Sequence, residues 1–314
     1  MKGLLPLRTN VFSIFRGGWM LMRAIAVLSS SIATIASTML PLFLYSSISN
    51  TFLSFLFLFL AFSAFMIHGV LTHAFNDYAD DLSGTDVHSE GILSGGSRVI
   101  QTGVISSETL WLIGKWLAIF LLAATGLLAL LAYYKLAVLL LVGIWAAASY
   151  SLPPLQLSYR PFLGEWLSLF PSILFLGVAG AWLILDPLPI WSVQNAVINA
   201  LFCLAWVMVH HIPDIEGDRQ AVPVKKTTVV WFADQFGRGY ARYPALIYLL
   251  MTGLCAVWLG FDRIWAAGGV VLFASIGIFL VWKINPSNIP QVTAYEKILL
   301  LLAIVTALWL GIFI

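Results

Sequence analysis

Long stretches without a charged residue are the feature that most constrains the fold of this chain. No Asp, Glu, Lys or Arg occurs between Arg23 and Asp77, a gap long enough for two membrane-spanning helices of about 20 residues each. Further charge-free stretches follow at 116–134, 136–159, 166–185, 187–213, 243–261, 264–282 and 298–314. Only helices and closed barrels satisfy their backbone inside a bilayer, and the length of these stretches favours helices.

Composition supports an integral, multi-pass membrane protein. Hydrophobic residues make up 61% of the 314 and charged residues only 10%, against about 25% charged in a typical soluble domain. We predict an all-α fold, a single domain over 1–314, with nine transmembrane helices around a central cavity. The nine helices are expected near 20–46, 52–76, 110–132, 136–152, 164–184, 191–212, 244–260, 264–282 and 296–314.

The distribution of basic residues predicts the orientation of these helices. With the N-terminus in the cytoplasm, 14 of the 16 Lys and Arg residues fall on the inner side, and only Lys135 and Arg263 fall on the outer side. Positive charge accumulates on the cytoplasmic side of membrane proteins, so we expect a cytoplasmic N-terminus. The same bias accounts for the net charge of +2, so no nucleic-acid partner is needed to explain it.

Acidic residues gather at two places, each at the predicted inner end of a helix. The first cluster begins with Asn76 and places Asp77 and Asp80 three positions apart. The second places Asp214 and Asp218 four positions apart. Residues at these spacings share one face of a helix, so each pair is expected to act together.

Each cluster opens a long connection on the predicted cytoplasmic side, at about 77–109 and 214–243, whereas the outer connections are short. Long loops in a compact protein are usually functional. We therefore expect the active site at the cytoplasmic mouth of the helix bundle.

The position of these carboxylates indicates a bound cation. A helix C-terminus already carries partial negative charge, and crowding carboxylates in a partly desolvated place adds to the cost. The potential metal ligands are carboxylate and amide oxygens, which suit Mg²⁺ rather than zinc. Next to the second cluster, His210 and His211 raise the alternative of a zinc site, but adjacent residues point to different faces of a helix. We expect two or more Mg²⁺ ions with a diphosphate bridging between them.

Basic and aromatic residues complete the predicted site. Arg98 follows a flexible Gly-Gly stretch, Arg160 lies in a predicted inner loop, and Lys225 and Lys226 follow the second cluster. Any of these could bind a diphosphate, although the positive-inside bias alone would also account for each of them. The 44 aromatic residues (13 Trp, 10 Tyr and 21 Phe) could line an intramembrane chamber and stabilise an allylic carbocation.

The pattern Asn76-Asp77-x-x-Asp80 with Asp214-x-x-x-Asp218 resembles the UbiA superfamily of intramembrane aromatic prenyltransferases. The resemblance extends over nearly the whole chain, because that family has nine helices with its acidic motifs after helices 2 and 6. Three further stretches resemble its 1,4-dihydroxy-2-naphthoate prenyltransferase branch: Gly84-Thr85-Asp86, Gly95-Gly96-Ser97-Arg98 and Tyr150-x-x-Pro153-Pro154. His210-His211 departs from that branch, which usually has Asn shortly before the second motif.

The resemblance implies Mg²⁺-dependent transfer of a polyprenyl group from an allylic diphosphate to an aromatic acceptor. For the naphthoate branch it implies loss of the ring carboxylate and a role in menaquinone biosynthesis, in a prokaryotic inner membrane. Catalytic and metal-binding roles are expected for the four motif aspartates, Asp77, Asp80, Asp214 and Asp218. Substrate contacts are expected from Asn76, Asp86, Arg98, Tyr150, Arg160, Lys225 and Lys226.

Other functions stay open at this point. Within the same superfamily, the acceptor could instead be 4-hydroxybenzoate, homogentisate or a lipid alcohol. A transporter is the alternative from another class, but apart from Arg23 no Asp, Glu, Lys or Arg is predicted deep in a span, where transporters usually keep such groups. A purely structural membrane subunit would leave the paired acidic motifs without a role.

Overall fold

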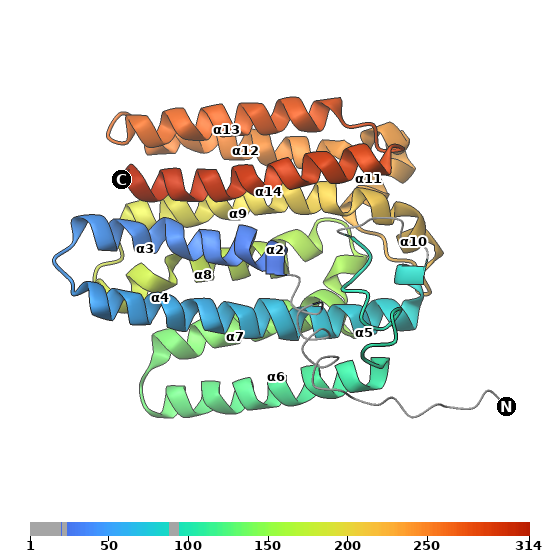
Figure 1. Cartoon of the computed structure of the whole chain (residues 1–314), viewed down its shortest axis with the longest axis horizontal. Coiled ribbons are helices and arrows are strands. Elements are labelled where there is room, and N and C mark those ends of the chain that lie inside the picture. The colour runs from blue at the N-terminus through green and yellow to red at the C-terminus, as the bar shows by residue number, and fades with distance from the viewer. Residues whose placement is uncertain (1–19, 21–23, 88–93) are drawn as a thin grey trace.

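The computed structural model describes residues 20, 24–87 and 94–314 of the chain, and these form helices and no strands. Nine helical segments in this part are long and apolar enough to cross a membrane, which confirms the predicted number. Figure 1 shows them side by side along one direction. The bounds of the spans are Ile25–Tyr45, Asn50–Ser83, Ser107–Leu130, Tyr134–Ser151, Glu165–Ile184, Ile190–Gln220, Arg238–Leu259, Ile264–Lys283 and Ile289–Ile312. Their orientation in the membrane stays a prediction.

Several spans consist of more than one helical element. The main α-helices are α2 (Ala24–Val27), α3 (Ala33–Tyr45), α4 (Asn50–Ala64), α5 (His73–Ser83), α6 (Ser107–Leu130), α7 (Tyr134–Ser151), α8 (Phe170–Ile184), α9 (Ile190–His210), α10 (Ile215–Gln220), α11 (Thr228–Phe236), α12 (Tyr243–Leu259), α13 (Ile264–Lys283) and α14 (Ile289–Ile312). Three π-helical segments lie within spans: η1 (Leu28–Ile32), η2 (Phe65–Thr72) and η5 (Glu165–Leu169). Short 3₁₀ turns are η3 (Thr85–Val87), η4 (Leu157–Tyr159), η6 (Ile212–Asp214) and η7 (Arg238–Arg242).

The two acidic helices extend further than expected. The span that starts at α4 continues through η2 and α5 to Ser83, and Gly84 then ends it in the left-handed conformation with φ 79°, which glycine adopts without strain. Proline cannot continue an α-helix because it lacks the backbone N–H, so α9 stops at His210 just before Pro213. The chain then passes through η6 into α10. The second acidic motif therefore lies on a helical continuation rather than at a free helix end.

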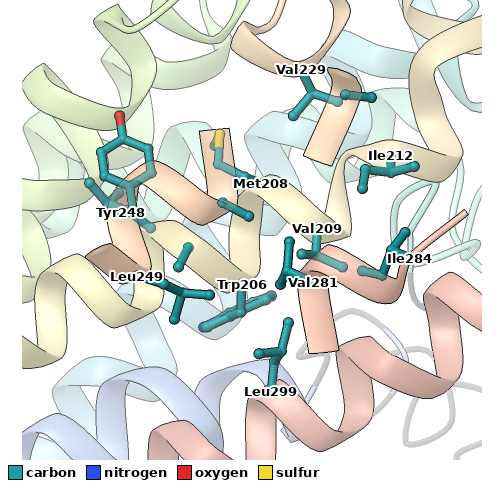
Figure 2. Close-up of a cluster of buried hydrophobic side chains, with 14 of the residues drawn as sticks. Trp206, Met208, Val209, Ile212, Val229, Tyr248, Leu249, Val281, Ile284 and Leu299 are labelled. Atoms are coloured by element: carbon teal, nitrogen blue, oxygen red, sulfur yellow. The ribbon is translucent and has the colours of Figure 1, made fainter. Parts of the chain in front are cut away.

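Helix α9 occupies the middle of the bundle and is the most buried span. Figure 2 shows its residues Trp206, Met208 and Val209 packed against side chains from α11 to α14, among them Leu249 and Leu299.

Small residues bring helices together elsewhere, as expected where lipid supplies no hydrophobic driving force. A Cβ at Gly177 of α8, for example, would lie 2.7 Å from the Cβ of Ala196 of α9. Both cysteines are free thiols, and Cys203 is buried in this core.

A polar cluster lies at the end of the bundle that holds the C-terminus of α14 (Figure 1). Its centre is Arg263, which follows α12 and is only 8% exposed. The guanidinium donates to Gln194 Oε1 and Asn195 Oδ1, both at 2.9 Å, and to the carbonyl oxygens of Leu310 at 3.2 Å and Phe313 at 3.0 Å. A cation at the C-terminal carbonyls of a helix is electrostatically favoured, so this cluster joins α9, α14 and the α12–α13 connection.

Candidate functional site

Helix α5 carries the first acidic motif at the opposite end of the bundle, where α10 and α11 also lie (Figure 1). Asp77 is 2% exposed, and its carboxylate accepts hydrogen bonds from Ser97, through the backbone N–H at 3.1 Å and through the side-chain hydroxyl. Gly96, with φ 71°, lies against Asp77 and Asp86, and a Cβ there would overlap Asp86 Oδ2 and Asp77 Oδ1. The Gly95-Gly96 stretch is therefore needed for close approach, and the Ser97 amide is committed to Asp77.

Asp80 is held by Lys225 from the loop after α10 and by Asn76 one turn earlier on α5. Lys225 Nζ lies 2.7 Å from Oδ1 and 2.9 Å from Oδ2 of Asp80, in a buried ion pair. Asn76 Nδ2 donates to Asp80 Oδ2 at 2.9 Å, and Ser151 of α7 in turn donates to Asn76 Oδ1 at 3.1 Å. Burial alone would lower the pKa of Lys225, but the carboxylates of Asp80 and Asp218 outweigh it and raise this pKa well above its usual range.

The second acidic motif faces the first across one pocket. Asp214 and Asp218 line this pocket of about 370 Å³ together with Asp80, Asp86 and Lys225. Thr227 donates to Asp218 Oδ2 at 3.4 Å. The predicted meeting of the two motifs at one mouth is thus present in the structure, although Asp77 itself is not among the pocket-lining residues.

The acidic pocket fits a hard divalent cation. One oxygen each of Asp86 and Asp218 is buried without a hydrogen-bond partner. Burial is the main cause that raises the pKa of Asp86 to about 8, and the carboxylates of Asp80 and Asp77 add to it. In the part of the chain that the structure describes, no three His, Cys, Asp or Glu residues are grouped closely enough to hold a metal. Mg²⁺ takes one or two carboxylates and completes its shell with water and substrate oxygens, and Asp80, Asp214 and Asp218 on the pocket wall offer such carboxylates.

The other predicted basic residues, Arg98, Arg160 and Lys226, are not on the wall of this pocket. Arg98 Nη1 donates to the backbone oxygen of Asp86 at 3.2 Å. Arg160 is exposed, and Lys226 is half-buried beside Lys225. Of the four basic residues predicted to contact substrate, only Lys225 lines the pocket in the structure.

A second, mostly apolar cavity of about 1210 Å³ adjoins the acidic pocket, and Tyr150 lines both. Aromatic side chains contribute to its wall, as expected, and these are Phe59, Tyr150, Phe175 and Trp206. Segments η1, η2 and η5 each supply lining residues, and π-helical segments are frequent at functional sites. Between η1 and η2, the Ser31 hydroxyl and His68 Nδ1 form a hydrogen bond of 2.8 Å.

Two histidines that the motif analysis set aside also line the acidic pocket. His211 Nε2 lies 3.3 Å from the hydroxyl of Tyr150, and His210 Nδ1 lies 2.7 Å from Glu296 Oε1 of α14. The position of the histidines just before Asp214 on the same helix could have indicated their place in the site. Nothing in the sequence around Glu296 pointed to it, because it is 86 residues away from His210.

Comparisons with known proteins agree with this arrangement. A model of the UbiA prenyltransferase family matches residues 32–301. The chain is similar to the structure of a UbiA homolog from Archaeoglobus fulgidus bound to GPP and Mg²⁺, with 17% identity and a TM-score of 0.59 over 94% of this chain and 99% of that one. The structure of a homolog from the same organism bound to DMAPP and Mg²⁺ gives 16% identity and a TM-score of 0.61 over 92% and 98%. No curated protein sequence matches the chain significantly.

Proposed function

We propose, since the chain belongs to the UbiA prenyltransferase family, that it transfers a polyprenyl group from an allylic diphosphate to an aromatic acceptor with the help of Mg²⁺. One observation carries the proposal: an acidic pocket with a buried lysine adjoins an apolar cavity, and Tyr150 belongs to both. A prenyl diphosphate has the same two parts, a polyanionic head and an apolar chain. The two archaeal homologs, which have the same fold, are bound to such diphosphates and Mg²⁺.

The diphosphate head belongs at the acidic pocket. Asp80, Asp214 and Asp218 line it and would hold Mg²⁺ with Asp77, and when bound the ions neutralise the charge that develops on the departing diphosphate. Lys225 adds a fixed positive charge on the pocket wall, where a preorganised group stabilises an anion without reorganisation. We propose that Arg98, Arg160 and Lys226 also attract the donor to this pocket.

The apolar cavity has two roles in this reaction. It accommodates the prenyl chain, and it keeps water away from the allylic carbocation that forms as the bond to the diphosphate breaks. The aromatic walls supplied by Tyr150 and Trp206 favour a nearby cation electrostatically. The electron-rich ring of the acceptor then captures the cation in place of water.

For the acceptor, we propose 1,4-dihydroxy-2-naphthoate and a role in menaquinone biosynthesis, at the cytoplasmic face of a prokaryotic inner membrane. The support is the resemblance of Gly84-Thr85-Asp86 and Gly95-Gly96-Ser97-Arg98 to the naphthoate branch. Asp86 and Gly96 both lie at the acidic pocket, so these motifs are part of the site.

A direct assay tests both the prenyl transfer and the identity of the acceptor. Purified protein receives geranyl diphosphate and Mg²⁺ with, in parallel, 1,4-dihydroxy-2-naphthoate, 4-hydroxybenzoate and homogentisate, and a matched set contains EDTA. We expect a prenylated product with loss of CO₂ from the naphthoate, detected by mass spectrometry, and none with EDTA. Product with 4-hydroxybenzoate alone would contradict the acceptor. If none of the three acceptors gives a product and the protein transports a solute in liposomes, the enzymatic function is contradicted.

A further inference from the structure

The apolar cavity runs lengthwise between α4, α7 and α8, which lie side by side in Figure 1. On α7 its lining begins at Tyr150, beside the acidic pocket, and ends at Leu136. An α-helix rises about 1.5 Å per residue, so this stretch is about 21 Å long. The lining on the next span, from Leu169 of η5 to Ala179 of α8, covers about 15 Å by the same rule.

Two hydrogen bonds fix the register of α7 against the span that contains α8. The hydroxyls of Ser149 and Ser168 form one of 2.8 Å, one position away from Tyr150. At the other end of α7, Lys135 Nζ donates to the Trp182 carbonyl oxygen at 2.6 Å. The two spans therefore run antiparallel along the same stretch, and the cavity between them is about 20 Å long.

This length corresponds to a definite number of isoprene units. An extended prenyl chain adds about 5 Å per unit, because each unit contributes four main-chain carbon–carbon bonds of about 1.5 Å that advance in a zigzag. The first four units of a donor therefore fit the cavity when the diphosphate lies in the acidic pocket. At the far end, Phe59 lines the cavity and is also 50% exposed. The cavity thus reaches the outside of the bundle there, and the described residues offer no wall to later units.

Two small residues lie on the cavity wall at different depths. Ala146 is one turn from Tyr150 on α7, at a depth of about 6 Å. Ile67 of η2 is level with Gly143, because a Cβ at Gly143 would lie 3.0 Å from Ile67 Cδ1. Ser63 lies one turn beyond Ile67 and lines the cavity, at a depth of about 16 Å. The second isoprene unit has to pass Ala146, and the fourth has to pass Ser63.

We propose that the protein recognises the first four isoprene units of its donor, and that Ala146 and Ser63 are specificity-determining residues that admit the second and the fourth unit. Both residues are half-buried, and a larger side chain at either position takes the space of one unit and blocks the way to the units beyond it. This inference rests on the proposed function and names the length of donor that the protein contacts.

The test measures how tightly donors of increasing length bind to variants in which the cavity is plugged. Allylic diphosphates with one to six isoprene units are added with Mg²⁺ and without an acceptor. Their dissociation constants are measured by tryptophan fluorescence, to which Trp206 on the cavity wall contributes. Each variant is compared with wild-type protein for the same donor, so the uptake of long donors by detergent cancels.

The two plugged variants are expected to differ in the donor length at which binding weakens. Ala146→Phe should weaken binding by about tenfold or more for donors of two units and longer, the scale of overpacking a filled space. For the one-unit donor we expect a change of at most about twofold. Ser63→Phe should weaken only donors of four units and longer, by a similar factor, and the loss should not grow from four units to six.

Control variants separate this effect from a general defect. Ser54→Phe on α4 and Ala123→Phe on α6 introduce the same side chain at exposed positions that do not line the cavity, and we expect every donor to bind within about twofold of wild type. Ala146→Leu and Ser63→Leu are smaller plugs, and they should show the same limits of donor length with smaller losses. The result therefore does not depend on the folding of a single variant.

The limit of donor length in each variant decides the inference. A shared limit in the two plugged variants, or an equal loss for all donors, would overturn it even if the protein transfers prenyl groups. A loss in Ser63→Phe that begins at two units, or that keeps growing beyond four, would also contradict it. Wild-type protein that binds none of the donors would contradict the proposed function itself.

Discussion

The bundle buries a polar cluster at each end, and the two clusters differ in the balance of their charges. At the end around Arg263, called the closed end below, the guanidinium has four hydrogen bonds to amide and carbonyl oxygens, and only its Nε lacks a partner. At the opposite end, called the open end below, Asp80, Asp86, Asp214 and Asp218 surround one pocket, and among the described residues Lys225 is the only Lys or Arg on its wall.

Charge balance explains what each cluster does. Burial lowers the pKa of Arg263 to about 10, so the guanidinium stays charged at neutral pH and its neutral partners suffice to hold it. The open-end cluster has four carboxyl groups and one lysine on the pocket wall, and buried oxygens of Asp86 and Asp218 lack partners. A buried charge without compensation costs stability. The closed-end cluster therefore serves the fold, and the open-end cluster is incomplete until a cationic ligand arrives.

The largest expected effect comes from removing one open-end carboxylate. We expect Asp218→Asn to reduce prenyl transfer by roughly a hundredfold to a thousandfold, the scale of losing one preorganised charge-stabilising group. The melting temperature in detergent is expected to stay the same or rise, because the substitution relieves repulsion from Asp214 and Asp80. A large fall in melting temperature would show that the open-end cluster also serves the fold.

The closed end should respond in the opposite way. We expect Arg263→Met to lower the free energy of unfolding by about 2–4 kcal/mol, because it leaves the buried oxygens of Gln194 and Asn195 without a donor. The turnover of the folded protein is expected to stay at the wild-type level. Lys135→Met is the control at the same end, since Lys135 donates one bond of 2.6 Å to the carbonyl oxygen of Trp182, and it should cost less. Loss of turnover in folded Arg263→Met would contradict the division between the two ends.

Ligand binding offers a smaller but sharper comparison. With Mg²⁺ and geranyl diphosphate at about 100 times their dissociation constant, wild-type protein should gain about 2.7 kcal/mol of stability. Arg263→Met is expected to gain the same amount from its lower baseline, and Asp218→Asn is expected to gain little. The shift is measured by thermal unfolding with and without EDTA. An equal gain in stability in the two variants would show that the cation does not bind at Asp218.

Much of the fold could be predicted because the bilayer imposes strict rules on length and polarity. Charge-free stretches of span length predicted nine helices, and the spacing of acids such as Asp77 and Asp80 predicted shared faces. The described part of the structure confirms the nine helices and places Asp77 and Asp80 on one helix, α5, although only Asp80 lines the pocket. These predictions needed only local sequence, since each helix satisfies its own backbone.

Contacts between distant segments could not be predicted in the same way. Lys225 and Lys226 are equivalent as sequence, and the choice between them depends on the backbone of their loop. There the Lys225 N–H donates to the Asp218 carbonyl at 3.0 Å and the Val222 N–H to the Ser83 carbonyl at 2.9 Å, which turns the Lys225 side chain to Asp80. The pairing of His210 with Glu296 likewise depends on the packing of α9 against α14.

The smallest expected effect concerns the basic residues around the open end, and it tests how far that region extends. Arg160 is exposed and Lys226 half-buried, so their attraction for a diphosphate acts through solvent, where charges at such positions contribute about 1 kcal/mol or less. We expect Arg160→Ala and Lys226→Ala each to raise the donor KM by about twofold to threefold at low salt, and the effect to vanish near 1 M salt, where the Debye length is about 3 Å. The acceptor KM should not change. A tenfold effect that persists at high salt would show that the side chain enters the pocket with the donor, and no effect at any salt would show that these residues serve membrane orientation instead.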